Sequence, residues 1–389
     1  MPSFQRVLRV ACQLLALSLL CPVAILAGEA VRKYQPLDWE WKKAEIAELK
    51  ELAQQVKTDP ADGSLTLETA NWRIRTWHTP LFTAQAGKYM ELFSEVFFKA
   101  FILKGERGFQ GFKPELRIHP SRDSYLATGA AQWSAGVNMA RWTVSGGKVT
   151  PEITLHTCFP YQKGENGKEG SKGKKGGGKG AAEPVFGSKV PLGTIQHEAT
   201  HCLLQCIYGP MVIPMWLNEG AASYYEGWPL RQRISEEGES PKDVEARNKR
   251  RSHSPGPREL SAQFRQRKDA PIPTLEELTS ANGPAEFYCD NGGPRTRLNY
   301  NLAESFIDFL MNSRNRRPLM LAILERVKEQ QGRAEPGKPF VTEAEIAEHE
   351  KDWLEFLQAR WGVKLPAAPL KERLRALKEK ERAGKGGNP

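Results

Sequence analysis

The spacing of apolar positions changes along the chain, from a mixture of two periods in the first half to a single period in the second. Helical spacing is present over residues 39–57 and from Pro80 to about residue 103. Alternation at every second position predicts strands in three segments, namely 65–77, 116–119 and 132–157. The first half should therefore combine a sheet with long helices.

Beyond residue 190 the apolar positions follow only the helical period. A helix is predicted over 190–208, which Gly209-Pro210 ends, and a second over 215–226, which begins after Pro214. Further helices are predicted over 300–312, 318–330 and 343–360. Strands mixed with helices, followed by helices alone, predict the α+β fold class.

Three segments carry no apolar pattern that could form a core. Residues 163–189 are mostly Gly, Lys, Glu and Ser and are expected to form a flexible loop. Residues 235–270 are charged and interrupted by Pro, which predicts a second long loop, and 366–389 should form a basic C-terminal tail. Before the tail we expect an N-terminal helical lead-in over 31–62 and one domain over 63–365.

The segment 1–30 has the pattern of a secretory signal peptide. Arg6 and Arg9 precede an apolar run, and the small residues Ala27 and Ala30 offer cleavage positions. The run is too short for a transmembrane helix. We therefore expect the mature protein to be exported, to the periplasm, the cell envelope or the exterior, without a membrane span.

The net charge of +10 on 389 residues raises the question of a nucleic-acid partner. The excess lies in the leader, in the loop over 163–189 and in the tail, which contribute +2, +4 and +4. The rest of the chain is close to neutral, and no aromatic and basic motif accompanies the charge. No nucleic-acid-binding face is therefore expected. With 40% hydrophobic residues, the chain can bury a core of ordinary size.

One short sequence carries the candidate chemistry. His197-Glu198-Ala199-Thr200-His201 lies within a predicted helix. Residues four apart on a helix share a face, so both imidazoles can bind a single zinc ion. Glu198 is rotated by about 100° from His197, which places its carboxylate beside the metal, where it can act as the catalytic base.

A third zinc ligand is expected from the next helix. Glu219 lies eighteen residues beyond His201, one turn into the helix predicted over 215–226. Two helices joined by a short connection pack antiparallel, so Glu219 can face the paired histidines. Three protein ligands leave a fourth position for water, as a catalytic zinc site requires.

The two motifs together resemble those of a known peptidase family. His-Glu-Ala-Thr-His over 197–201, followed by Trp-Leu-Asn-Glu-Gly-Ala-Ala-Ser-Tyr over 216–224, looks like the gluzincin metallopeptidases. The second motif is similar to that of aminopeptidase-N-like enzymes. The closer resemblance is to the peptidase-MA-like group of exported bacterial proteins, whose pattern is also similar at 117–125, 273–278 and 300–306. These segments cover roughly residues 65–360.

The resemblance implies a thermolysin-like, gluzincin catalytic domain, with a small mixed sheet over the active-site helix and a helical half after it. It assigns the zinc ligands to His197, His201 and Glu219, and the base to Glu198. It does not extend to aminopeptidase activity. The gap from His201 to Glu219 is one residue shorter than in those enzymes, and their glycine-rich anchor for a free amino terminus has no counterpart here.

Two further roles at the site, the donor to the developing negative charge and the residue that orients a ligand histidine, are predicted with alternatives. The negative charge that develops during peptide hydrolysis needs a hydrogen-bond donor besides zinc. Tyr300, expected at the start of a later helix, is the catalytic residue that we favour for this role, and Tyr224 and Tyr225 compete with it. Ser223, one turn beyond Glu219, either orients a ligand histidine or merely packs.

The remaining histidines and cysteines carry weaker signals. His78, His119 and His156 lie in or beside predicted strands and are expected to be structural. Four cysteines remain once the leader is removed, namely Cys158, Cys202, Cys206 and Cys289. Two disulfides and buried free thiols are both compatible with this number in an oxidising compartment.

Two functions follow from these residues. The first is an exported zinc metallopeptidase that hydrolyses a peptide or protein substrate through zinc-activated water and Glu198. The alternative is a non-catalytic binding or scaffold protein of the cell envelope, with a residual zinc site. The intact Glu198 favours catalysis, because a structural site needs no base and usually has four protein ligands. Substrate, endo- or exo-specificity and oligomeric state are left open by the sequence.

Overall fold

The computed structural model describes most of the chain between residues 41 and 385. The described residues are 41, 43–101, 112–132, 134–146, 148–159, 186, 191–209, 213–226, 255–266, 272–290, 293–311, 316–330 and 339–385. The predicted leader and, except for Phe186, the predicted loop over 163–189 lie outside the described residues. None of the described helices combines the length and apolar character that a membrane crossing requires.

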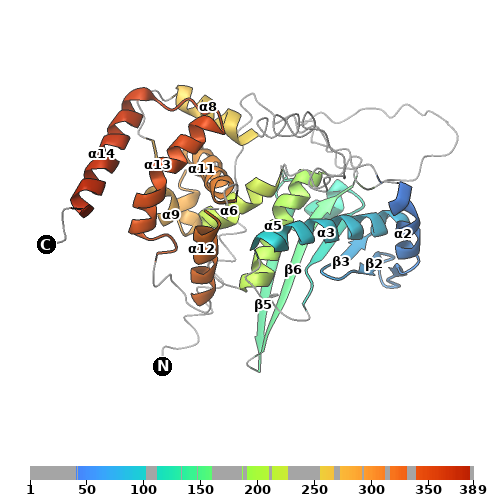
Figure 1. Ribbon diagram of the computed structural model, residues 1–389. Helices are drawn as coiled ribbons and strands as arrows, with labels where there is room; N and C mark the ends of the chain where they lie inside the picture. Colours follow the sequence, from blue (N-terminus) through green and yellow to red (C-terminus); the bar gives the residue numbers. More distant parts are fainter. Residues whose placement is uncertain are drawn as a thin grey trace, which may run out of the picture.

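A six-stranded mixed sheet dominates the first half of the chain (Figure 1). In spatial order its strands are β1 (Lys57–Thr58), β2 (Leu65–Glu68), β3 (Arg73–Thr76), β4 (Glu115–His119), β6 (Lys148–Cys158) and β5 (Gly136–Ser145). Strand β4 is parallel to β3 and β6, and the other neighbouring strands are antiparallel. Strand β5 is therefore an edge strand, and it forms a long hairpin with β6.

The register of the strands explains which face of the sheet is buried. It aligns one apolar residue from each of four strands in a row, namely Leu67, Ile74, Leu116 and Leu155. All four are at most 2% exposed. Because successive side chains point to opposite faces of a sheet, charged residues such as Arg75 lie on the other face.

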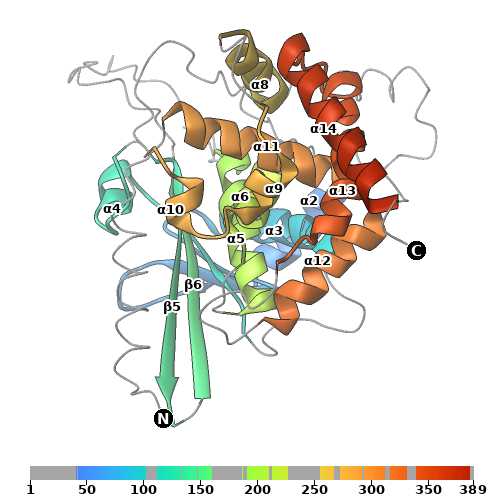
Figure 2. The ribbon, with the colours of Figure 1, turned by 90° about the vertical axis from the view of Figure 1, so that its left-hand side faces the viewer.

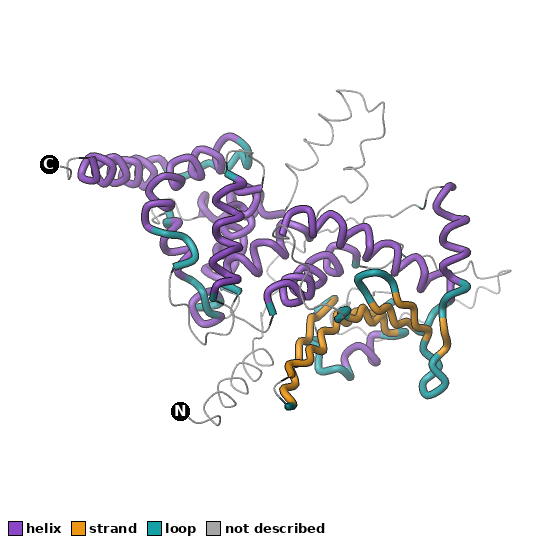
Figure 3. The backbone as a smooth tube through the Cα atoms, turned by 60° about the horizontal axis from the view of Figure 1, so that its bottom comes forward, coloured by secondary structure: helices purple, strands orange, loops and turns teal. Residues whose placement is uncertain are grey.

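Two long helices cover the apolar face, and Figure 3 shows the strands on one side with the long helices on the other. Helices α3 (Pro80–Phe101) and α5 (Leu192–Tyr208) contact the sheet, and α2 (Lys43–Ala53) lies against α3. The short helix α4 (Arg122–Leu126) packs on β4 and β6. Its Tyr125 contacts the ring of His119, which is on the opposite face of the sheet from Leu116.

The second half is a group of helices built around α11 (Pro294–Met311), as Figure 2 shows. The helices in contact with α11 are α6 (Met215–Glu226), α8 (Pro255–Gln266), α9 (Leu275–Ser280), α12 (Arg317–Glu329) and α13 (Glu343–Ala359). Helix α10 (Pro284–Phe287) contacts α6, and α14 (Ala367–Lys385) contacts α13. One buried apolar cluster continues from the sheet into these helices. The predicted α+β class is thus confirmed.

Two predicted elements need correction in the helical half. The long loop predicted over 235–270 is wrong at 255–266, where α8 forms and buries Leu260 and Phe264. These apolar residues are four apart, as in a helix, but the polar and charged residues around them hide that spacing. Helix α11 begins six residues earlier than predicted, so Tyr300 lies in its second turn instead of at its start.

The ends of the predicted domain also differ from expectation. Strand β1 pairs with β2, so the sheet begins inside the segment predicted as a helical lead-in over 31–62. Much of the predicted basic tail over 366–389 is the helix α14. It is attached to α13 by an ion pair in which Arg373 Nη2 lies 2.6 Å from Oε1 of Glu350, a residue with a 1% exposed side chain.

Candidate metal centre

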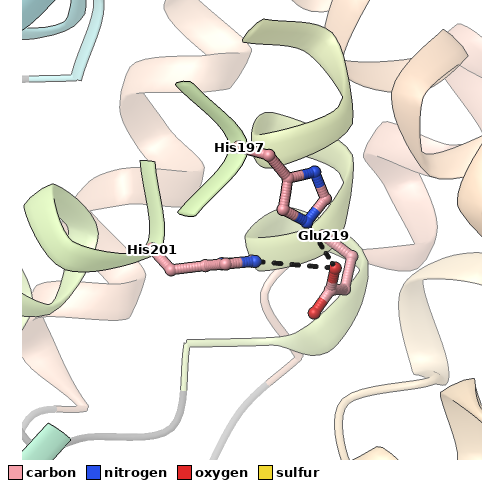
Figure 4. A group of neighbouring side chains, drawn as sticks. All are labelled: His197, His201 and Glu219. Atoms are coloured by element: carbon pink, nitrogen blue, oxygen red, sulfur yellow. Dashed lines mark ion pairs between the residues drawn. The ribbon is translucent and has the colours of Figure 1, made fainter. Parts of the chain in front are cut away.

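Helix α5 carries the histidine pair. Buried residues such as Ile195 and Leu203, both at most 1% exposed, hold this helix against the sheet. His197 and His201 lie one turn apart, with ring centroids separated by 4.9 Å. Both rings reach the same point beside the helix (Figure 4). Helical periodicity alone produces this arrangement, as the sequence predicts.

Close helix packing places α6 next to this pair. A Cβ atom at Gly193, near the start of α5, would lie 2.7 Å from the carbonyl oxygen of Glu226, at the end of α6. The two helices are therefore antiparallel and almost in backbone contact at this end. On the other side of α6, a Cβ atom at Gly220 would lie 2.8 Å from the backbone carbonyl of Ala303 on α11. Helix α6 is thus held tightly between α5 and α11.

The three predicted ligands converge on one point (Figure 4). Oε2 of Glu219 lies 3.6 Å from Nε2 of His197 and 3.7 Å from Nε2 of His201, and the three ligand atoms lie within 4.8 Å of one another. Ligand atoms around a tetrahedral zinc ion, with bonds of about 2.0–2.2 Å, are separated by about 3.4 Å. The spacing therefore leaves room for a metal ion between them.

The chemistry of these side chains also fits a metal ion. Oε2 of Glu219 is buried and has no hydrogen-bond partner among the described residues. Buried polar atoms are normally hydrogen-bonded, so a carboxylate oxygen that faces two imidazole nitrogens at 3.6 and 3.7 Å without a hydrogen bond fits the position of a metal ligand. Two imidazole nitrogens and one carboxylate oxygen are ligands that zinc accepts. The group can therefore hold a metal ion.

Two further residues lie beside the Nδ1 atoms of the histidines. Nδ1 of His201 lies 2.9 Å from Oδ1 of Asn218, an oxygen that can only accept a hydrogen bond. Nδ1 of His201 therefore carries the proton, and Nε2 keeps its lone pair for the metal. Nδ1 of His197 lies 3.5 Å from Oε2 of Glu226. Asn218 thus occupies the orienting role for which the sequence suggested Ser223, whereas Glu226 lies at ion-pair distance from His197 without a hydrogen bond to it.

Tyr288, in the turn after α10, is a site residue that the sequence did not predict. Its hydroxyl donates a hydrogen bond of 2.6 Å to Oε1 of Glu219. The hydroxyl of Tyr300, the predicted catalytic tyrosine, donates to the hydroxyl of Tyr288 at 3.5 Å. Tyr300 therefore lies at the site but reaches the carboxylate through Tyr288. Nothing in the local sequence distinguishes Tyr288, since Gly283 and Pro284 before it indicate only a turn.

The electrostatics of the group couple metal binding to proton release. Burial disfavours protonation of His197, but the carboxylates of Glu219 and Glu226 outweigh it and hold the pKa of His197 well above its ordinary value. Burial would raise the pKa of Glu219, yet His201, His197 and the Tyr288 hydroxyl lower it to about 2. A metal must displace the proton from His197 before it binds there. Burial, with Glu219 nearby, raises the pKa of Tyr288 well above its ordinary value, so its phenol is a neutral donor.

Glu198 lies beside the histidine pair, on the side of α5 that faces the sheet. Its Oε2 accepts a hydrogen bond of 2.9 Å from the backbone N–H of Asn138 on the edge strand β5. The side chain of Asn138 is itself held by α5, through Gln205 at 3.1 Å and Cys202 at 3.3 Å. A Cβ atom at Gly136 would lie 3.3 Å from Cγ of Glu198, so only glycine leaves this space open. The carboxylate is thus placed beside the histidine pair, not between them.

Among the remaining predicted histidines, His119 and His156 form a pair, and His78 packs separately. Nε2 of His119 lies 3.0 Å from Nδ1 of His156, and Trp77 stacks on the ring of His119. Burial lowers the pKa of His119 to about 4 and that of His156 to about 3. His78 packs against Phe82, and burial lowers its pKa to about 4. These neutral, packed rings agree with the structural role predicted for them.

The tyrosines and cysteines that the sequence left with alternatives are mostly buried in the core. Tyr225 is fully buried and packs against Phe93, with ring centroids 5.6 Å apart, which removes it from the solvent side of the site. Tyr224 is 8% exposed and stacks edge-on against Tyr225. All four cysteines of the described part are free thiols, namely Cys158, Cys202, Cys206 and Cys289.

Comparison with known proteins does not assign the chain to a family. No protein-family model matches it, and no curated protein matches it either. What the chain does is therefore inferred from its own side chains, and above all from the group formed by His197, His201 and Glu219, with Glu198 beside it.

Proposed function

We propose that the chain is an exported zinc metallopeptidase of the gluzincin type. In this proposal His197, His201 and Glu219 bind zinc, and Glu198 is the general base. The observation that carries it is the convergence of the three ligand atoms within 4.8 Å, around a buried carboxylate oxygen that has no hydrogen-bond partner in the described part of the chain.

The number of ligands supports a catalytic centre over a structural one. In the described part of the chain the group contains three potential ligands, and no fourth His, Cys, Asp or Glu joins it. Structural zinc sites usually close with four protein ligands, whereas catalytic sites keep one position for water. The carboxylate of Glu198, on the helix turn that carries His197, supplies the proton acceptor that such a site needs.

The reaction assigned to these residues is hydrolysis of a peptide bond. A zinc ion supplies Lewis acidity, which makes water more acidic and draws electrons from a peptide carbonyl. Glu198 removes a proton from the attacking water as its oxygen forms a bond to the carbonyl carbon. Glu198 then returns that proton to the peptide nitrogen as the C–N bond breaks, so the products are a carboxylic acid, which keeps the other proton of the water until it ionises, and an amine.

Tyr300 is the proposed donor to the negative charge that develops on the carbonyl oxygen. Its hydroxyl lies next to that of Tyr288, and Tyr288 already donates to Glu219. The hydrogen bond from Tyr300 to Tyr288 is long, at 3.5 Å, whereas that from Tyr288 to Glu219 is short, at 2.6 Å, so the proton of Tyr300 is the easier of the two to redirect to a substrate oxygen. Burial raises the pKa of Tyr300 well above its ordinary value, so its proton is retained near neutral pH.

The architecture supports the gluzincin assignment at a coarser level. A mixed sheet covers α5, the helix with the histidine pair, and a helical half follows with the third ligand on α6. Export remains a proposal that rests on the leader over 1–30. The alternative envelope scaffold depends on the basic loop over 163–189, of which only Phe186 is described, so no structural observation favours it.

The test compares two acid-to-amide variants of the same site. Purified wild type should contain about one zinc ion per chain and cleave members of a peptide library. Glu198→Gln should keep the zinc but lose about 10²–10⁴-fold in cleavage rate, because the proton acceptor is gone. Glu219→Gln should instead lose zinc affinity, because a neutral amide is a weaker ligand than a carboxylate.

A matched control is Glu152→Gln, an exposed acid on β6, which should behave as the wild type in both assays. Full cleavage by zinc-loaded Glu198→Gln would sink the proposal, and so would a wild-type protein that takes up no zinc.

A further inference from the structure

We propose that Tyr288 is a positioning residue for the metal centre: its hydroxyl holds one oxygen of Glu219, so that the other faces both histidines, and this restraint sets metal affinity and coordination geometry. This inference rests on the proposed zinc centre and assigns a role to a residue on neither of the two ligand helices.

The two oxygens of Glu219 have different surroundings. Oε1 accepts the hydrogen bond of 2.6 Å from Tyr288, whereas Oε2 lies 3.6 and 3.7 Å from the two histidine nitrogens. A hydrogen bond this short to a buried carboxylate is strong and directional. It stabilises one rotation of the carboxylate plane, in which a single oxygen faces the metal. Tyr288 therefore favours coordination through one oxygen over coordination through both.

Tyr288 is itself held in place by residues outside the metal centre. Its neighbour Phe287 is fully buried, and the Phe287 carbonyl accepts a hydrogen bond of 2.8 Å from Nδ2 of Asn299 on α11. The rings of Phe287 and Tyr288 pack edge to face, with centroids 5.4 Å apart. The backbone N–H of Met215, at the start of α6, donates to the carbonyl of Asn282 at 3.1 Å. The turn that carries Tyr288 is thus tied to both α6 and α11.

Loss of this hydroxyl would leave a specific defect. Oε1 of Glu219 would become a buried acceptor without its phenol donor, and an unsatisfied buried polar group is costly. The carboxylate could lower that cost by rotating Oε1 towards the metal. Removing the hydrogen-bond partner of a metal ligand typically lowers metal affinity by about 10–100-fold. The defect should therefore appear in metal binding even when no substrate is present.

The chain offers two tyrosines for comparison. Tyr208, at the end of α5, is 1% exposed and donates to the carbonyl of Phe101 at 3.0 Å, away from the metal ligands. Tyr208→Phe therefore removes a buried phenol hydrogen bond of the fold alone. Tyr300→Phe removes a phenol that donates to Tyr288 and should have an intermediate effect.

The experiment measures the dissociation constant for Zn²⁺ by competition with a chromophoric chelator, together with the absorption spectrum of the Co²⁺-loaded protein. Tyr288→Phe should bind Zn²⁺ about 10–100-fold more weakly than the wild type and show a changed Co²⁺ spectrum. Tyr208→Phe should stay within about threefold, which is the spread expected for a distant change. In a Glu219→Ala background, Tyr288→Phe should have no further effect, because its target is gone.

The outcomes separate this inference from the proposed function. Wild-type Zn²⁺ affinity and Co²⁺ spectrum in Tyr288→Phe would overturn the role of Tyr288 and leave the zinc centre standing. Absence of Zn²⁺ binding by the wild type would overturn both. Unfolding of metal-free Tyr288→Phe, with Tyr208→Phe intact, would also overturn the inference, because Tyr288 would then hold the fold and not the ligand.

Discussion

On the sheet side of α5, Glu198 accepts one backbone hydrogen bond from β5, whereas on the helical side Glu219 accepts one from the Tyr288 phenol. Glu198 is partly exposed, while Glu219 is 6% exposed and enclosed by helices. A carboxylate that exchanges protons with water needs access and freedom to move. One that binds a metal needs a fixed direction and burial. The two environments match these two needs, although the residues are of the same type.

The two sides also differ in the kind of atom, backbone or side chain, that limits how closely neighbouring helices and strands can pack. At Gly220, on the helical side, backbone atoms of Ala303 occupy the space beyond the missing side chain. At Gly136, on the sheet side, side-chain atoms of Thr194 and Glu198 occupy it. Side chains can rotate away from a new methyl group, but a packed helix backbone cannot do so without moving the helix. The helical side should therefore be the more rigid of the two.

The largest expected effect tests this difference in rigidity. One methyl group is added on each side of α5 by a Gly→Ala substitution. Gly220→Ala places a Cβ atom 2.8 Å from the Ala303 backbone, and such overpacking costs about 1–3 kcal/mol. The helix propensity of Ala offsets about 1 kcal/mol, which leaves a net loss of up to about 2 kcal/mol. Gly136→Ala should cost less than about 1 kcal/mol but slow peptide cleavage, because Glu198 is displaced.

Urea unfolding of the two glycine variants, with cleavage assays in parallel, measures both effects. Equal losses of unfolding free energy in Gly220→Ala and Gly136→Ala would contradict the difference in rigidity between the two sides.

A smaller effect, on Zn²⁺ affinity, is expected when the hydrogen-bond partner of His201 is removed on the helical side. Asn218→Ala removes the acceptor for Nδ1 of His201, so the imidazole loses its fixed orientation. Zn²⁺ affinity should fall by about tenfold, the lower end of the range for such partners. Ser223→Ala, on the same helix, should leave the affinity within about twofold. Isothermal titration with Zn²⁺ distinguishes the two, and the reverse order would restore Ser223 as the orienting residue.

The smallest effect concerns the other face of the sheet, where His119 and His156 lie. Their pKa values of about 4 and about 3 are below the unfolded value of about 6.5, so the unfolded chain binds protons first as pH falls. Their contribution to stability is complete above pH 6.5 and is lost as pH falls towards 4 and then 3. Between pH 7 and 5.5 each histidine should remove about 1 kcal/mol from the unfolding free energy.

Urea unfolding at both pH values, for the wild type and for His156→Gln, measures this contribution. The variant should lose about 1 kcal/mol less than the wild type over the same interval. An identical pH dependence would show that the pKa of His156 is the same in the folded protein as in the unfolded chain.

Local periodicity explains how much of the site the sequence could predict. His197 and His201 share a face because they are four apart on a helix, and this holds wherever the helix packs. Glu219 could be predicted because a short connection forces α6 to run back along α5. The order of strands and helices was likewise sufficient for the α+β class. Each of these inferences depends on residues that are close in the chain.

The partners of the two carboxylates were decided only by the tertiary structure. Asn138 lies 60 positions before Glu198, and Tyr288 lies 69 positions after Glu219. Asn138 meets Glu198 because β5 lies at the sheet edge, and Tyr288 meets Glu219 because the turn after α10 packs against α6 and α11. The spacing of apolar residues along the sequence predicts neither contact. Helix α8 was missed for a related reason, since only its contact with α11 makes Leu260 and Phe264 a buried face. Local order thus follows from the backbone, whereas contacts between distant segments follow from the packing of the whole chain.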